Sequence, residues 1–276
     1  MTMNAARIRY WRPVAEAGTD LGCGCLEVEQ TVPHLHEEWQ FAVAETPSKL
    51  SLGAFRRYDA GAHHVTVVAP YAVHGEGSAI GEPTRWHTLY VAPQLLDELH
   101  GGVPTFQQPI VSDEPAAFEL RDLLGQSGEG VLVGAEFLAR ATRWLRQLLA
   151  AWARAGAAPG PVHPVERVRV YLQAHVTEPV GLGELETAAG VTASLTRSFS
   201  RAVGLPLKSY HAQLRLARAH RLLAQGRSAT WVAHECGFAD QSHLSRRFKE
   251  CHGVTPGVFQ AQCRIQADAA RAAAIS

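Results

Sequence analysis

One stretch near the C-terminal end of this 276-residue chain constrains its fold most. It holds a small residue, Ala233, then Gly237, then Leu244 and Phe248 four residues apart. A small side chain lets two helices approach closely, and glycine adopts turn conformations that a β-carbon would strain. Residues four apart lie on one face of a helix. The pattern predicts a helix-turn-helix whose second helix buries Leu244 and Phe248.

The opposite face of that second helix is polar. Arg246 can bridge the O6 and N7 atoms of guanine, Gln241 can bridge adenine, and serine suits either base. Positive side chains further round the helix suit phosphates. The alternative is an amphipathic helix with a solvated polar face. We predict DNA contacts from Gln241, Ser242, Ser245, Arg246, Arg247 and Lys249.

Part of this pattern occurs twice. Leu195, Phe199, Gly204 and Tyr210 recur as Leu244, Phe248, Gly253 and Phe259, at a constant offset of 49 residues. The repeat predicts a second, earlier helix-turn-helix, and the apolar residues from Leu207 to Leu223 predict a helix that connects the copies. The candidate DNA contacts of the earlier copy are Thr192, Ala193, Ser194, Thr196, Arg197 and Arg201.

The string from Ala233 to Phe259, with its duplication, resembles the arabinose-regulator (AraC) family of bacterial transcription regulators. The resemblance implies a tandem DNA-binding domain, promoter DNA and a small-molecule effector as partners, and activation through contact with RNA polymerase. Three features depart from the family pattern. Glu186 replaces a small alanine, the turn from Gly190 is one residue shorter, and Gln260 replaces an arginine.

The charges divide the chain. Residues 1–160 hold 12 Lys and Arg against 18 Asp and Glu, a net −6, whereas residues 161–264 hold 13 against 7, a net +6. Concentrated positive charge suits phosphate binding. We predict a sensing and dimerisation domain at 1–154, a Gly- and Pro-rich linker at 155–164, a DNA-binding domain at 165–264 and a tail at 265–276.

Composition and segment lengths indicate a globular protein. Hydrophobic residues make up 46% and charged residues 19% of the chain. We expect no signal peptide at the N-terminus and no membrane span, because no apolar run approaches about 20 residues. Five cysteines, an odd number, suit reduced thiols, so the expected location is the cytoplasm.

Residues 21–91 alternate short strand-like segments, such as 26–29, 50–52 and 65–68, with Gly and Pro. Many short strands predict a sandwich or barrel. The order of motifs around His34 and His74 resembles the cupin-like sensor domain of the same regulators. The predicted fold class is therefore a two-domain α+β protein, in which a cupin-like jelly roll with C-terminal helices precedes an all-α tandem helix-turn-helix domain.

The N-terminal histidines are candidate effector ligands. His34 and His36 alternate on a strand and so share one face. In metal-binding cupins such a pair acts with a glutamate, replaced here by Gln40, and a distant histidine, which His74 could supply. We predict effector contacts from His34, His36, Gln40 and His74, with no cofactor and no bound metal. A metal site, structural histidines, and a zinc site shared with Cys23 and Cys25 remain alternatives.

A second amphipathic segment, Glu136 to Arg154, carries an apolar stripe that either packs on its own domain or joins a second subunit; the resemblance favours a homodimer. No Ser-His-Asp set, phosphate-binding glycine loop or CxxC pair is evident, so we predict no enzyme activity. The leading hypothesis is a ligand-responsive regulator. The alternatives are a cupin enzyme fused to a DNA-binding domain and an architectural DNA-binding protein.

Overall fold

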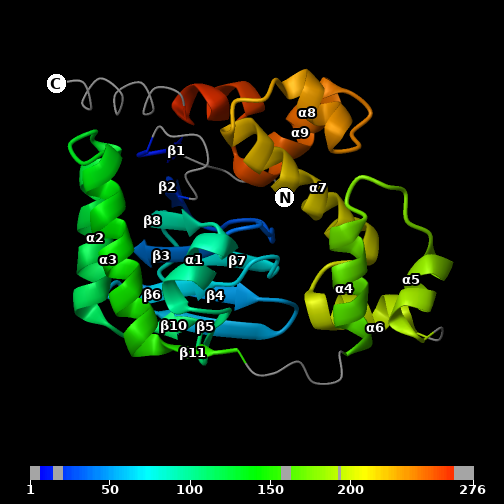
Figure 1. Ribbon diagram of the computed structural model, residues 1–276, viewed down its shortest axis with the longest axis horizontal. Helices are drawn as coiled ribbons and strands as arrows, with labels where there is room; N and C mark the ends of the chain where they lie inside the picture. The colour runs from blue at the N-terminus through cyan, green and yellow to red at the C-terminus, as the bar shows by residue number, and fades with distance from the viewer. Residues whose placement is uncertain (1–6, 15–20, 157–162, 192–193, 264–276) are drawn as a thin grey trace.

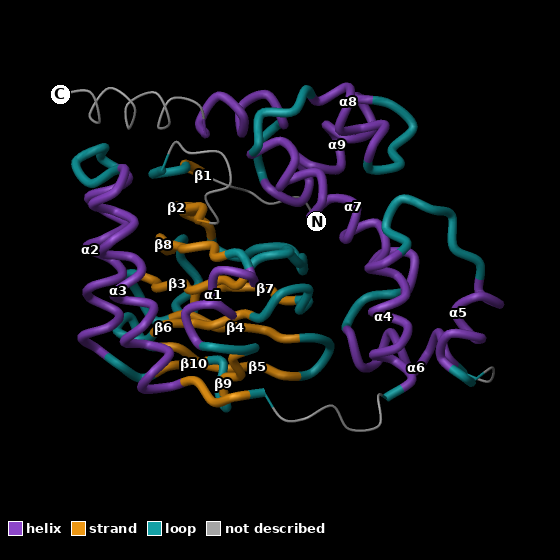
Figure 2. Tube along the Cα trace, viewed as in Figure 1, coloured by secondary structure: helices purple, strands orange, loops and turns teal. Residues whose placement is uncertain are grey.

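The computed structural model describes residues 7–14, 21–156, 163–191 and 194–263. Strands are confined to an N-terminal domain that ends at Gly156. From His163 onward the described residues form helices and loops alone (Figures 1 and 2). This architecture confirms the predicted fold class, a β-rich domain followed by a helical one.

The strands of the N-terminal domain form two main sheets with antiparallel pairing throughout. The bounds are β1 (Arg7–Trp11), β2 (Leu21–Val28), β3 (Trp39–Ala44), β4 (Ser48–Leu52), β5 (Arg56–Ala60), β6 (Val65–Val68), β7 (His74–Ser78), β8 (Thr84–Val91), β9 (Pro104–Phe106), β10 (Ile110–Val111) and β11 (Ala153–Ala155). The large sheet has the order β1-β2-β8-β3-β6-β10 and the small one β5-β4-β7, while β9 and β11 pair separately. The predicted strand segments fall in β2, β4 and β6.

Helices α1 (Pro93–His100), α2 (Glu114–Gly128) and α3 (Gly134–Trp152) belong to the N-terminal domain, where α2 and α3 run along one side of the sheets (Figure 1). Alternate residues of β3, such as Phe41 and Val43, share a hydrophobic core with α2 and α3. Phe137 and Leu145 of the predicted α3 stripe are fully buried in that core. The stripe from Phe137 to Leu148 is therefore covered by its own domain.

The other face of β3 turns toward the small sheet. Gln40 of β3 donates a hydrogen bond of 2.6 Å to Glu76 of β7, so the inner faces of the two sheets meet there. Trp86 of β8 is 1% exposed among Val28, Ala42 and Ala44. It is a core residue.

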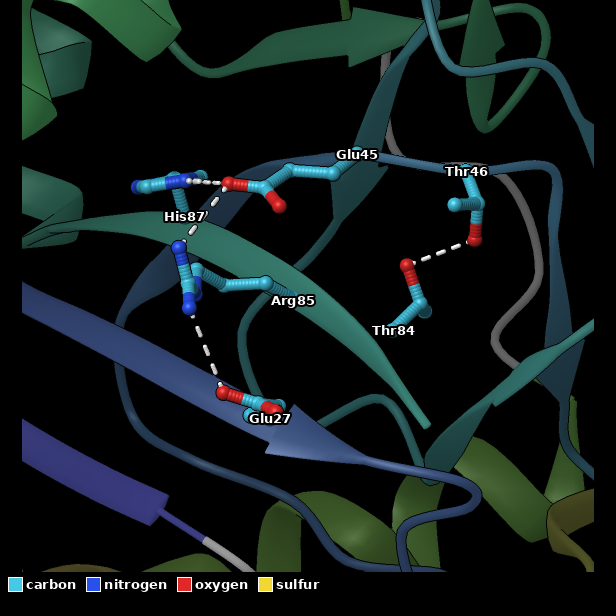
Figure 3. Close-up of polar contacts among 6 residues, drawn as sticks. All are labelled: Glu27, Glu45, Thr46, Thr84, Arg85 and His87. Carbon is cyan, nitrogen blue, oxygen red and sulfur yellow. Dashed lines mark hydrogen bonds and ion pairs between the residues drawn. The ribbon is translucent and has the colours of Figure 1, made fainter. Parts of the chain in front are cut away.

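A polar network covers part of the large sheet where β2 and β8 lie side by side (Figure 3). Arg85 reaches Glu27 at 3.3 Å and Glu45 at 3.5 Å, and His87 lies 3.1 Å from Glu45. These groups are partly exposed, so each pair contributes at most about 1 kcal/mol to stability.

The C-terminal domain consists of helices α4 (Pro164–Ala174), α5 (Leu182–Ala189), α6 (Leu195–Val203), α7 (Leu207–Ala224), α8 (Ala229–Glu235) and α9 (Gln241–His252), and residues 256–263 are helical again. Side chains cap the starts of α8 and α9: Ser228 accepts from the amide of Trp231, and Asp240 from that of His243. Such caps typically contribute about 1 kcal/mol each. Among the described residues, no helix is both long and apolar enough to cross a bilayer.

Candidate nucleic-acid interface and sensor site

Helix α9 presents the polar face that its sequence predicts. Leu244 and Phe248 are 0% exposed and anchor the helix in the core of the C-terminal domain. Of the candidate DNA contacts, Ser245 and Arg247 are half-buried, and Gln241, Ser242, Arg246 and Lys249 are exposed. Because the burial alternates with the helical period, one face is free for a ligand as large as DNA.

The turn before α9 is held by three local features. Gly237 has φ +70°, and an added β-carbon there would lie 3.1 Å from the carbonyl oxygen of Thr177. Thr230 of α8 donates a 2.8 Å hydrogen bond to Gln241 at the first turn of α9. Asp240 caps the helix at 2.7 Å. Together these contacts fix the angle between the two helices of the motif.

The basic residues of α9 differ in whether they form an ion pair. Arg247 pairs with Glu250 at 2.9 Å on the same helix, whereas Arg246 and Lys249 form no ion pair with any described residue. An exposed pair of this kind is worth at most about 1 kcal/mol, so Arg247 can exchange it for a phosphate. Arg246 needs no such exchange.

The earlier copy is less regular, as its sequence indicates. Helix α6 begins at Leu195, whereas α9 begins three residues before the matching Leu244. Ser194 precedes α6 in the left-handed region with φ +62°, and Thr192 and Ala193 lie outside the described residues. Thr196, Arg197 and Arg201 are exposed on α6. Relative to the shared leucine, the described part of the first recognition helix therefore starts three residues later than the second.

Helix α7 joins the two motifs over 18 residues, about 27 Å at 1.5 Å per residue. Gln260, where the family resemblance leads one to expect arginine, donates to the carbonyl oxygens of Leu223 at 3.2 Å and Arg227 at 2.6 Å. These carbonyls lie at and just beyond the C-terminal end of α7. Gln260 therefore donates hydrogen bonds to backbone carbonyl oxygens at the end of the connecting helix. The sequence did not reveal this role.

The predicted sensor histidines come together. His34 and His74 pair through both backbone hydrogen bonds at 2.9 Å, and their ring centroids lie 4.2 Å apart. The ring of His36 lies 4.8 Å from that of His74. Nδ1 of each histidine contacts a backbone carbonyl oxygen: that of Val32 for His34, Glu38 for His36, and Ala72 for His74.

A buried polar chain extends from this cluster. Nε2 of His36 lies 2.9 Å from the side-chain amide of Gln40, which also contacts Glu76. Burial and the nearby His34 lower the pKa of His36 to about 4, and burial raises the pKa of Glu76 to about 7. The side-chain oxygen of Gln40 faces Nε2 of His36, and its side-chain nitrogen donates to Glu76.

Glu76 was not among the sequence candidates. It follows His74 by two residues on β7, so both side chains lie on the same face of that strand. This period-two spacing was the available signal. Two further histidines, His220 of α7 and His252 of α9, approach the cluster from the C-terminal domain, and burial lowers the pKa of both. Nothing in the local sequence pattern indicated their proximity.

The space beside the histidines is small. It measures about 20 Å³, is lined by residues that include His34, His36 and His252, and suits one water molecule, not an organic effector. Among the described residues, no group of three or more His, Cys, Asp and Glu side chains is arranged to hold a metal ion. Strand β2, which carries Cys23 and Cys25, pairs with β1 and β8, so these cysteines do not flank the histidines.

The two domains share hydrophobic cores. Tyr10 of β1 packs with Phe248 and Phe259 in the core of the second helix-turn-helix, and its amide donates to Gln262 at 3.0 Å. Leu35 and Val73 enter the core of the first motif. Glu37 pairs with Arg221 of α7 at 2.5 Å. The N-terminal domain therefore contacts both motifs and the helix that joins them.

Comparison with known proteins gives matches concentrated in the C-terminal domain. A family profile described as a helix-turn-helix domain matches residues 187–262. The uncharacterized HTH-type transcriptional regulator YbfI of Bacillus subtilis is 36% identical over 87 residues, which cover 31% of this chain and 32% of that protein. The HTH-type transcriptional activator RhaS of Pectobacterium carotovorum is 32% identical over 94 residues, covering 33% and 34%. The chain thus spans about a third of the length of the curated relatives it matches.

Solved structures extend the likeness to both domains. Unsaturated-fatty-acid-bound ToxT from Vibrio cholerae has a TM-score of 0.55 at 10% identity, covering 95% of this chain and 97% of that one. At this identity the likeness shows the fold alone. The fold and the exposed helices define a two-domain protein with tandem helix-turn-helix motifs. Its C-terminal sequence matches, a helix-turn-helix domain profile and HTH-type transcriptional regulators, support the resemblance to the AraC family.

Proposed function

We propose that this chain is a bacterial transcription regulator that binds promoter DNA sequence-specifically through α6 and α9. The observation that carries the proposal is the exposed polar face of α9, with Gln241 and Arg246 presented opposite a fully buried Leu244 and Phe248. Helix α7 holds a second exposed helix, α6, at its other end. Two recognition helices on one connector suit successive major grooves, whose repeat is about 34–36 Å.

We further propose that each segment has its own function. Residues 165–264 bind DNA, residues 155–164 link the domains, and residues 1–154 bind a small-molecule effector and form the homodimer. Activation through RNA polymerase, in the cytoplasm, completes the proposal. One matched relative is described as a transcriptional activator, and one structural neighbour was solved with a bound fatty acid, which supports an activator with an effector.

Selection of bound sequences from a random DNA pool by the full-length protein tests the DNA-binding proposal. We expect enrichment of a motif with two contacted segments separated by about 10 base pairs, and binding that weakens as salt rises because counterions are released. An architectural protein would enrich no motif. That outcome would overturn the sequence-specific function and leave the fold assignment intact.

A further inference from the structure

A large cavity lies between the N-terminal domain and the helices that carry the DNA-binding motifs. Its volume is about 540 Å³, within the range of small-molecule pockets. Tyr71 and Tyr90 line it from the N-terminal domain. Arg218 and Arg221 line it from one face of α7, and Gln225 lines it from just past the C-terminal end of that helix. An organic effector fits here and does not fit the small space beside the histidines.

The charged side chains of the lining differ in whether they form an ion pair. Nε of Arg221 pairs with Glu37 at 2.5 Å, and Arg218 pairs with Glu235 at 2.7 Å. Glu38 also lines the cavity and forms no ion pair with any described residue. These two arginines therefore already have carboxylate partners, whereas the Glu38 carboxyl group, although Arg221 and backbone amides act on it, forms no ion pair among the described residues.

Two aromatic side chains, Tyr71 and Tyr90, line the same cavity as this carboxyl group. Burial, with the charges of Glu37 and Glu38, raises the pKa of Tyr71 to about 12; Glu38 is also among the groups that raise the pKa of Tyr90. Both rings are therefore near enough to Glu38 to sense its charge. The face of an aromatic ring attracts a cation, most strongly where water is excluded. A carboxyl group without an ion-pair partner, in a cavity that two aromatic side chains also line, suits an organic cation.

We propose that this cavity is the effector site and that it takes an organic cation, an amine or quaternary ammonium compound with an apolar body. Glu38 is the counter-ion, and Tyr71 and Tyr90 form the aromatic walls. The inference rests on the proposed function, because it names the effector class that the regulator responds to. A cation in this position contacts the N-terminal domain and α7 together, and its differential affinity for two placements of α7 would bias DNA binding.

The protonation of Glu38 supports this assignment. Burial and the neighbouring Glu37 raise the pKa of Glu38 to about 7, while Arg221 of α7 and nearby backbone amides act in the opposite direction. Tyr71 and Tyr90, two further titratable groups of the lining whose pKa values are raised, stay neutral at this pH. A bound cation favours the carboxylate, so binding releases a proton and affinity falls below about pH 7, approaching about tenfold per pH unit.

Calorimetric titration of the full-length protein tests the proposal with named probes. We expect binding of benzyltrimethylammonium and choline. The uncharged isostere of choline, in which a tert-butyl group replaces the trimethylammonium group, should bind about tenfold more weakly or worse. Octanoate serves as the anionic comparison. Absence of cation binding, or equal binding of the isostere or of octanoate, would overturn the proposal.

Two matched pairs of variants locate the site. Glu38→Gln should weaken cation binding by about tenfold or more, whereas the exposed Glu29→Gln should leave it unchanged. Tyr71→Leu should weaken binding, and Tyr71→Phe, which keeps the ring face, should not. Thermal melts establish that each variant folds, and wild-type affinity in both Glu38→Gln and Tyr71→Leu contradicts the site. DNA binding is measured separately, so its absence would overturn the proposed function and leave the cavity result standing.

Discussion

At the residue scale, two small sets of polar side chains differ in their chemistry and in their exposure. Arg246 is exposed and uncommitted on α9, and Gln241 is oriented by Thr230. His36, Gln40 and Glu76 form a buried chain whose proton positions are linked. The first set points outward and suits recognition. The second points inward between the sheets, so its substitution acts first on stability.

Arg246→Ala should lower affinity for the selected site more than affinity for unrelated DNA. A good bidentate base contact is worth about 1–3 kcal/mol of discrimination, whereas a phosphate contact carries no sequence information. Lys249→Ala should therefore weaken both kinds of DNA about equally. Competition titrations measure the two affinities, with the exposed Arg146→Ala of α3 as a control that changes neither. Equal losses on both DNAs for Arg246→Ala would contradict its assigned role.

Glu76→Gln should stabilise the protein at about pH 8 and leave its stability unchanged near pH 4.5. The folded state holds the pKa of Glu76 near 7, above the ordinary 4.5. Between these values the folded state retains a proton that the unfolded state has released, so the free energy of unfolding of the wild type falls as pH rises. The full difference is about 3 kcal/mol. Urea unfolding at the two pH values measures it, and a pH-independent difference would contradict the protonated chain.

At the scale of elements, turn geometry decides how the recognition helices are held. Gly237 combines a positive φ with a close backbone neighbour, which is why the motif requires glycine there. The two copies share their buried leucine and phenylalanine but differ at the start of the second helix. Helix α6 spans 9 residues and α9 spans 12, so the copies present unequal surfaces.

Gly237→Ala should destabilise the protein by about 1–2 kcal/mol, because alanine is strained at φ +70° and its β-carbon would crowd Thr177. Gly257→Ala is the matched control. Gly257 lies in the helical segment 256–263 with nothing within 4 Å of an added β-carbon, so alanine there should be neutral or stabilising. Chemical denaturation of both variants tests the contrast. Equal effects would show that the turn does not depend on the glycine conformation.

At the scale of the whole molecule, the domains are joined through cores and not only through the linker. Tyr10 enters the second motif, Leu35 and Val73 enter the first, and the backbone of Gly53 meets that of Gly204 so closely that a β-carbon on Gly204 would lie 2.6 Å from it. The cavity with Glu38 lies within the same interface. An effector in that cavity would therefore act directly on the arrangement of both motifs.

The full-length protein should unfold in one cooperative transition because its cores span both domains. Tryptophan fluorescence reports mainly on the N-terminal domain, which contains five of the six tryptophans, and far-ultraviolet circular dichroism reports mainly on helices. The two denaturation curves should coincide in the wild type. Tyr10→Ala should destabilise the protein by about 3–5 kcal/mol and separate the curves. Separate curves in the wild type would show that the domains unfold independently.

Much of the helical half could be predicted because its signals are local. Helix α7 lies within a residue of the predicted connector, and Leu244 and Phe248 are buried as their spacing indicates. In the N-terminal half, alternating segments indicated strands, and His34, His36, Gln40 and His74 do meet. Their common neighbour Glu76 and the approach of His220 and His252 depend on contacts between distant segments, which no periodicity encodes.

The sequence by itself determined the two-domain order, the tandem motifs and the polar face of α9, because capping, turn geometry and helical period act over a few residues. Only the tertiary structure decided that the α3 stripe is covered by its own domain, that the histidines lie beneath the second motif, and that a cavity lined by Glu38 opens against α7. The physical reason is the distance along the chain over which each kind of interaction acts. Local propensity selects each element, but burial of its apolar face is completed by whichever distant element packs against it.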